Sequence, residues 1–388
     1  MASTVTSLRL ATITLVRDGA DILVPFVEHH LSLVDRAFVI DHLSVDGTRE
    51  WLGRRAREDV AGRLEVLHYD QPAYYQSHLS DLLAREAFAD GADWVLFLDV
   101  DEFLAFEHRA ALEAALAPIA GGLAKFVWSH LIPTVLSDQG PFDVTQELRT
   151  TPTRRRAGRS KVAIHRSFAA RHPGFRVDGG NHGVRATPGG RSLRGEHAGT
   201  LLHLPIRSRA QLDHKVAVRM ASFRATEASE HGIAPHMLRL AATLERVERG
   251  GPVEGDRELI ELAVLEYEGD DALSDGIDRS QQETVLLPSS VRAAAERALR
   301  DAASGFGVDG PSISRNQMEQ AQHCGPLGQW RAHRSEQSVR VDPAPLGRVT
   351  DLLIDIRGLL SPRAALRRII VRVVRVVRRI RAGDRPAP

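Results

Sequence analysis

The chain has 388 residues, of which 43% are hydrophobic and 26% charged, so it is long enough for two domains and too apolar for general disorder. Its formal net charge of +1 gives no overall attraction to nucleic acid, and we expect no nucleic-acid partner. The single cysteine, Cys324, excludes an internal disulfide bond and fits a reducing compartment.

Strand-like and helix-like patterns alternate through the first hundred residues. The expected strands are Leu8–Val16, Arg36–Asp41, Leu64–Tyr69 and Asp93–Asp101, and the expected helices are Ala20–Leu33, Asp46–Ala56 and Ser77–Gly91. Asp46 suits a helix N-cap, and Gly91 suits a helix end. This alternation predicts an α/β fold with a mainly parallel sheet and helices on both faces.

Each of the four expected strands ends in an acidic residue. These residues are Asp18, Asp41, Asp70 and Asp99. Aspartate favours loops and caps through its own hydrogen bonds, so any one of them is ordinary. Ligands of parallel sheets, however, bind outside the carboxyl ends of the strands. Four acids at that edge therefore predict a binding site there.

The fourth strand runs into the most acidic stretch of this edge, "DVDE". It places Asp99, Asp101 and Glu102 within four residues, where their charges repel one another. Hard oxygen ligands suit Mg²⁺ or Mn²⁺, which keep waters and accept phosphate oxygens. Such a cation would also neutralise a diphosphate leaving group. Because an Asp-x-Asp pattern is common by chance, an acidic turn is the alternative on the motif alone.

The remaining chain divides into regions of different composition. Residues from about 125 to 205 are strand and loop, rich in glycine, histidine and arginine, and the chain then becomes mainly helical. We expect a first domain over residues 1–215, a mainly helical accessory region over 216–345 and a basic segment over 346–388.

The basic segment predicts an amphipathic helix. Arg368, Arg372, Arg375 and Arg379 share one helical face, and apolar residues form the other. Such a helix either lies on an anionic membrane surface or packs its apolar face on the protein itself. The chain shows no signal-peptide pattern and no apolar run of spanning length. We therefore expect a cytoplasmic protein that binds peripherally to the inner membrane face.

Three stretches together, "ITLVRDGADILVPFVEHHLSL", "FVIDHLSVDGT" and "DWVLFLDVDEFL", resemble the family 2-type glycosyltransferases, in the soluble group with an Asp-x-Asp-Glu-Phe motif. The resemblance covers about residues 8 to 215. It implies a GT-A fold, which is Rossmann-like, a nucleotide-sugar donor and a Mn²⁺ or Mg²⁺ cofactor. The acceptor, a glycan, lipid or protein, and the stereochemistry of transfer stay open.

The resemblance also implies roles for individual residues. The implied metal ligands are Asp99, Asp101 and the late histidine His203. The implied donor-binding residues are Asp41 and Asp46 at the nucleoside, with Asp18, Gln76, Lys161 and Lys215 around it. A base must take the proton of the acceptor hydroxyl if the anomeric centre inverts, and Asp178 and His182 are the candidates.

The chain departs from this family pattern at two places near the nucleoside. It has Asp18-Gly19 where the family usually reads Asn-Glu, and His42-Leu43 where it reads Asn followed by a variable residue. Two other classes therefore stay open: a non-catalytic protein that binds a sugar or a partner, and a metal-dependent phosphoesterase. The second would need ligands for two cations about 4 Å apart, and no obvious cluster supplies them.

Overall fold

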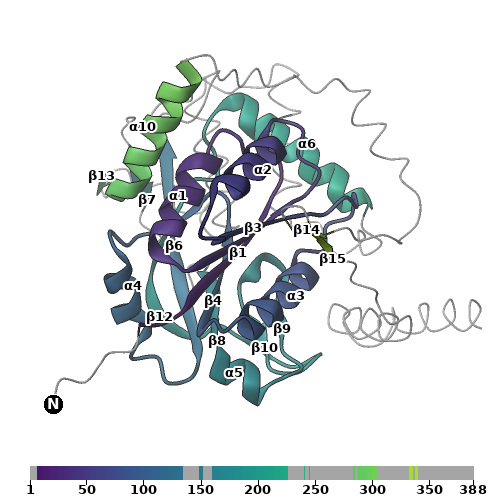
Figure 1. Cartoon of the computed structure of the whole chain (residues 1–388), viewed down its shortest axis with the longest axis vertical. Helices are drawn as coiled ribbons and strands as arrows, with labels where there is room; N and C mark the ends of the chain where they lie inside the picture. Colours follow the sequence, from purple (N-terminus) through teal and green to yellow (C-terminus); the bar gives the residue numbers. More distant parts are fainter. Residues whose placement is uncertain are drawn as a thin grey trace, which may run out of the picture.

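The structure, a computed structural model, describes residues 7–133, 148–151, 160–225, 240, 244, 283–284, 287–303, 332–334 and 337–339 (Figure 1). The basic segment 346–388, with its expected amphipathic helix, lies outside the described residues. None of the helices that the structure describes has the length and apolarity needed to span a bilayer.

The order of elements follows the expected alternation through the first hundred residues. The strands are β1 (Leu10–Val16), β2 (Arg36–Asp41), β3 (Leu64–His68), β4 (Trp94–Asp99), β5 (Glu102–Leu104), β6 (Leu123–Pro133), β7 (Leu148–Thr151), β8 (Ser160–His165), β9 (Arg176–Val177), β10 (Val184–Arg185), β11 (Ser192–Leu193), β12 (Glu196–His203), β13 (Glu283–Thr284), β14 (Ala332–Arg334) and β15 (Gln337–Val339). The helices are α1 (Leu23–Leu33), α2 (Thr48–Glu58), α3 (Gln76–Ala89), α4 (Arg109–Leu116), α5 (Arg166–Arg171), the 3₁₀ turn η1 (Gly179–Asn181), α6 (Arg209–Ala225) and α10 (Ser289–Ala303).

The large sheet has a parallel half and a mixed half. In the first half, β3, β2, β1 and β4 lie side by side and all pair in parallel. In the second half, β4 pairs antiparallel with β8, and β6 pairs antiparallel with β7 and β8 but parallel with β12. Direct connections allow antiparallel pairing, whereas a parallel pair needs a crossover element such as a helix. The predicted α/β fold is confirmed, with parallel pairing concentrated where helices separate the strands.

Two hydrophobic cores lie on opposite faces of this sheet. Strand β4 contributes Leu96 and Leu98 to one core and Val95 and Phe97 to the other. Residues of α1, α4 and α10 fill the first core, and residues of α3 and α5 fill the second. Because both faces are covered, the apolar run of β4 is fully buried, and only Asp99 at its carboxyl end is partly exposed.

Helix α10 belongs to this first domain in space although it is distant in sequence. Its Ser290 Oγ lies 2.6 Å from His29 Nδ1, and its Ser289 hydroxyl donates to Glu107 at 2.7 Å. His29 Nε2 in turn lies 2.8 Å from the Leu104 carbonyl oxygen. His29 of α1 is therefore a buried structural residue. The boundary expected at residue 215 falls inside α6.

Candidate active site

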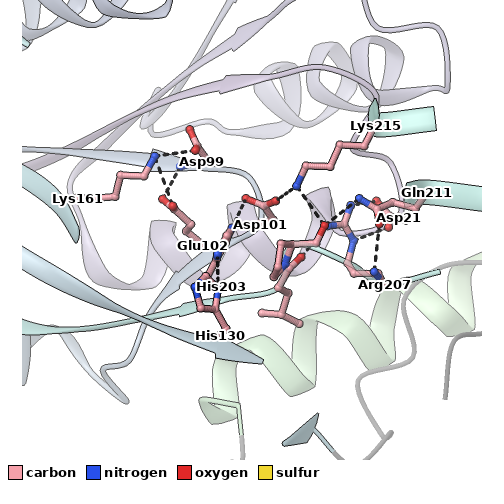
Figure 2. A network of polar contacts seen from close by, with 12 residues as sticks. Asp21, Asp99, Asp101, Glu102, His130, Lys161, His203, Arg207, Gln211 and Lys215 are labelled. Carbon is pink, nitrogen blue, oxygen red and sulfur yellow. Dashed lines mark hydrogen bonds and ion pairs between the residues drawn. The ribbon is translucent and has the colours of Figure 1, made fainter. Parts of the chain in front are cut away.

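The acidic stretch leaves the sheet at the carboxyl end of β4, between the parallel half and β5. Asp99 is the last residue of β4, and Glu102 is the first of β5. The buried carboxylate of Glu102 accepts the backbone N–H of Asp99 at 2.8 Å, which closes the tight turn between the two strands. The turn thus presents Asp99 and Asp101 together at the sheet edge, where Figure 2 shows them within one polar network.

Asp99 is held by two side chains from other elements. Gln76, at the start of α3, donates to its Oδ1 at 2.8 Å, and Lys161 on β8 donates to its Oδ2 at 2.6 Å. The same ammonium lies 3.4 Å from Glu102 Oε1. Two residues assigned to the donor site from sequence, Gln76 and Lys161, are therefore brought to the acidic stretch.

The charges in this group depend on its burial. The Lys161 side chain is only 1% exposed. Burial by itself would lower the pKa of Lys161, but the Asp99 and Glu102 carboxylates raise this pKa above its usual value. Burial raises the pKa of Glu102 well above its usual value, although Lys161 opposes the shift. Lys161 therefore stays cationic, and Glu102 is harder to ionise than an exposed glutamate.

Asp101 is held by a second lysine. Lys215 on α6 donates to its Oδ2 at 2.7 Å and to the Pro205 carbonyl at 3.1 Å. Burial by itself would raise the pKa of Asp101, but the charges of Lys215 and Arg207 hold it well below its usual value. Asp101 is therefore an ionised carboxylate at neutral pH.

His203 lies beside Asp101 at the end of β12. Its Nε2 is 3.7 Å from Asp101 Oδ1, and its Nδ1 is 2.9 Å from Nδ1 of His130 on β6. The Trp128 indole stacks on its ring, with centroids 4.4 Å apart and planes at 25°. Burial lowers the pKa of His203 well below its usual value, so the ring is neutral, which is the form that binds metals.

The residues at Asp101 fit a divalent cation with two protein ligands. The 3.7 Å separation between Asp101 Oδ1 and His203 Nε2 is too long for a hydrogen bond but suits two ligands of one ion, each at about 2.0–2.2 Å. Across the described part of the chain, no group of three or more His, Cys, Asp or Glu side chains forms a metal cage. Water or ligand oxygens would therefore complete the coordination, as is usual for Mg²⁺.

Two lysines of the chain also offset the repulsion between the carboxylates of the acidic stretch. Lys161 neutralises Asp99, and Lys215 neutralises Asp101, so the two aspartates are balanced by two cations of the chain itself. Charge balance alone therefore does not call for a metal. The case for one rests on the facing Asp101 and His203.

The two candidate bases lie in different surroundings. His182 Nδ1 donates to the Ser160 carbonyl at 2.9 Å, and its ring lies edge-on to Trp128. Gly180, at φ 74°, makes room for it, because a Cβ there would lie 2.7 Å from the imidazole. Asp178 instead accepts hydrogen bonds from Arg185 Nε, at 2.6 Å, and from the Ser192 hydroxyl.

The predicted nucleoside-side aspartates lie along the loops after β1 and β2. Asp41 is fully buried and accepts from Arg49 Nε at 2.6 Å, while Arg49 also bridges to Asp70 at 2.7 Å. Asp46 accepts the backbone N–H groups of Ala20 and Thr48 at 2.9 and 3.0 Å. Asp46 therefore fixes the conformation of both loops.

Asp18 also links two parts of this edge. Its Oδ1 accepts the Val45 N–H at 2.8 Å, and its Oδ2 lies 2.8 Å from His214 Nε2 on α6. Its φ of 51° is in the left-handed region that most residues avoid. The loop after β1 is thus held against both the β2 loop and α6.

Several residues of this site were not expected from the sequence. Trp128 and His130 are two positions apart on β6, so both face His203; the alternation in "FVWSHLIP" is the signal that could have indicated them. Arg207 pairs with Asp21 through two contacts of 2.6 and 2.9 Å and joins the β12–α6 connection to the loop before α1.

No protein-family model matches the sequence, and no curated protein matches it. Among solved structures, the chain is similar to the mannosyltransferase PcManGT from Pyrobaculum calidifontis in complex with GDP-Man and Mn²⁺, with 11% identity, 82% of each chain covered and a TM-score of 0.35. It is also similar to GalNAc-T7 with UDP, GalNAc and Mn²⁺, with 14% identity, 63% of this chain and 55% of that chain covered, and a TM-score of 0.33. A third similar structure is S. aureus TarS 1–349 in complex with UDP-GlcNAc, with 11% identity, 67% of this chain and 83% of that chain covered, and a TM-score of 0.33. Similarity this low shows no function, so the residues of the chain itself have to indicate it.

Proposed function

We propose that the protein is a metal-dependent glycosyltransferase that moves a sugar from a nucleotide-diphosphate donor to a hydroxyl of a glycan, lipid-linked or protein acceptor. The observation that carries the proposal is the convergence of Gln76, Lys161, His203 and Lys215, from four separate elements, on Asp99 and Asp101. They meet at the carboxyl edge of the parallel half of the sheet, where α/β proteins bind their ligands.

The chemistry divides among these residues as follows. In the transfer, the acceptor oxygen bonds to the anomeric carbon, the bond from that carbon to the diphosphate breaks, and the acceptor proton passes to a base. Asp101 and His203, with Asp99 beside them, would hold Mn²⁺ or Mg²⁺, which when bound offsets the charge of the leaving diphosphate. Lys161 and Gln76 orient Asp99, and Lys215 offers a further positive charge.

His182 is the better candidate for the base. Because its Nδ1–H donates to the Ser160 carbonyl, Nε2 is the nitrogen that accepts a proton. Its ring also lies against Trp128, which stacks on His203 beside Asp101. Asp178 has its carboxylate bound by Arg185 and Ser192, which favours a structural role.

The test is release of nucleoside diphosphate from a panel of nucleotide sugars with Mn²⁺ and with Mg²⁺. We expect release from at least one donor and its loss in excess chelator. Hydrolysis of simple phosphoesters instead would indicate the phosphoesterase. No turnover of either class, with binding of a nucleotide sugar retained, would indicate the non-catalytic binding protein. The phosphoesterase is the weaker alternative, because the described residues offer no cluster for a second cation.

Asp41→Ala and Asp46→Ala are expected to raise the KM for the donor by roughly tenfold and to change kcat much less, because these carboxylates hold loops on the nucleoside side, and interactions remote from the reacting bond contribute mostly uniform binding. Steady-state kinetics with varied donor concentration measure the two constants separately. Thermal unfolding controls for the loss of the Arg49 pair and of the loop hydrogen bonds. A fall in kcat at unchanged KM would place these residues in the chemistry.

The 388-residue chain is expected to sediment with anionic liposomes and not with neutral ones, because each arginine of the basic segment contributes roughly 1 kcal/mol near an acidic lipid surface. A chain that ends at residue 360 should lose this binding. The full chain with Arg368, Arg372, Arg375 and Arg379 changed to glutamine is the matched control for charge. Equal sedimentation of the full and shortened chains would contradict a membrane anchor.

A further inference from the structure

Arg17 leaves the sheet at the carboxyl edge of its parallel half. It follows β1 directly, and β1 lies between β2 and β4. The register pairs Val16 with Asp41 on one side and Leu15 with Asp99 on the other. Arg17 therefore lies between the strand end that carries Asp41, a predicted nucleoside-binding residue, and the strand end that carries Asp99, a predicted metal ligand.

The aspartates that flank Arg17 already have other cationic partners. Asp41 binds Arg49 at 2.6 Å, and Asp99 binds Lys161 at 2.6 Å. The ion pair of Arg17 with Asp18 is long, at 3.9 Å from Nε to Oδ2, and that oxygen is 2.8 Å from His214 Nε2. The positive charge of Arg17 is thus poorly matched by these carboxylates.

The Arg17 side chain is held in place by one hydrogen bond, while another of its donors lacks an acceptor. Its Nη1 donates to the Ser222 hydroxyl of α6 at 2.8 Å, and its side chain is 20% exposed. Its Nε is buried and has no hydrogen-bond partner among the described residues. A buried donor without a partner costs free energy unless a ligand supplies the acceptor.

A second arginine, Arg219, lies on α6, the helix that carries Ser222. Arg219 lies one turn before Ser222 on α6, and its guanidinium is 4.2 Å from the centre of the Tyr74 ring. Tyr74 in turn packs beside His42, with ring centroids 6.1 Å apart.

The charges of the two arginines shift the pKa values of neighbouring groups. Burial, with the nearby Arg219 charge, lowers the pKa of Arg17 although Asp18 opposes the shift. Burial and then the Arg17 charge lower the pKa of His42 to about 4, and Arg219 adds to this effect. This part of the edge is therefore electropositive, next to the acidic stretch.

We propose that Arg17 and Arg219 form an anion-binding subsite for a phosphate or diphosphate group. Arginine presents a planar fork of N–H donors that matches phosphate oxygens and keeps its charge at any relevant pH. Ser222 sets the orientation of Arg17, and Tyr74 supports the plane of Arg219. This inference rests on the proposed function, in which the anion is the diphosphate of the donor.

The test is calorimetric titration of the full chain in excess chelator with UDP, GDP, inorganic pyrophosphate and the unphosphorylated nucleosides. Arg17→Met is expected to weaken the binding of the phosphorylated ligands by about 10- to 100-fold, the loss typical of a hydrogen bond to a charged group, with any binding of the nucleosides unchanged. Arg219→Met should act in the same direction, and Ser222→Ala should cost only a few-fold. Arg57→Met, which removes the same charge from an exposed position on α2, should have little effect.

The outcomes separate this inference from the proposed function. Equal affinity of Arg17→Met and wild type for a bound nucleoside diphosphate overturns the subsite and leaves the transferase standing. Arg17-dependent binding of pyrophosphate, without binding of any nucleotide either in chelator or with Mn²⁺, supports the subsite and counts against the transferase. Wild-type protein that binds no phosphorylated ligand in chelator overturns the subsite, and donor turnover with Mn²⁺ then decides the transferase separately. If Arg17→Met unfolds early in a thermal scan, Arg17→Lys keeps the charge but loses the fork, and its affinity should be intermediate.

Discussion

Asp101→Asn is expected to lower the rate of donor turnover by about 10²–10³-fold or more, the effect of losing a group that stabilises charge in the transition state. The amide keeps the shape of the side chain but removes the charge that faces both Lys215 and His203. The fold should survive, because the backbone carbonyl of Asp101 still accepts the Leu204 N–H at 2.8 Å and keeps the turn joined to β12.

Direct binding of Mn²⁺, followed by electron paramagnetic resonance, is the companion measurement. Asp101→Asn and His203→Ala should both weaken Mn²⁺ binding, because the two side chains are the facing pair of ligands. The effect on binding separates a metal role from a general loss of activity. Full turnover by Asp101→Asn, or full turnover by wild type in excess chelator, would exclude the metal. Unchanged Mn²⁺ affinity in His203→Ala would remove that residue from the ligand set.

Lys161→Met is expected to destabilise the protein by about 3–5 kcal/mol, which is the usual effect of removing one partner from a buried ion pair. The lysine side chain is 1% exposed, and its loss leaves Asp99 without its cation and Glu102 buried with two acidic neighbours. Chemical denaturation of the full chain measures the free energy of unfolding. Adding Glu102→Gln to the variant should recover part of the loss, because it removes one buried acidic group that Lys161 no longer compensates.

Arg209→Met is the matched control for this experiment. Arg209 pairs with Asp213 at 3.0 Å across one turn of α6, but the two side chains are 26% and 43% exposed. Exposed pairs of this kind contribute less than about 1 kcal/mol. A loss in Lys161→Met as small as that of the control would mean that Lys161 is not the counter-ion on which the acidic stretch depends.

The sequence by itself predicted the elements of the first hundred residues closely. Strand β2 was predicted at its observed residues, and β3 was predicted to within one residue of its end. These predictions depend on the burial pattern within one segment, which a short window of sequence contains. The sequence also predicted the edge of the sheet at which Asp99 and Asp101 lie, because the carboxyl ends of parallel strands meet on one side of the sheet.

The tertiary structure alone decided which distant residues meet there. Lys161 and Lys215 share no local pattern with the acidic stretch, yet each binds one of its aspartates. Ser222 orients Arg17, and α10 completes the core against α1. Such contacts join segments separated by tens to hundreds of residues. No periodicity within a segment encodes them; they form because the packing of both sheet faces brings these side chains together, where buried polar groups pair with one another.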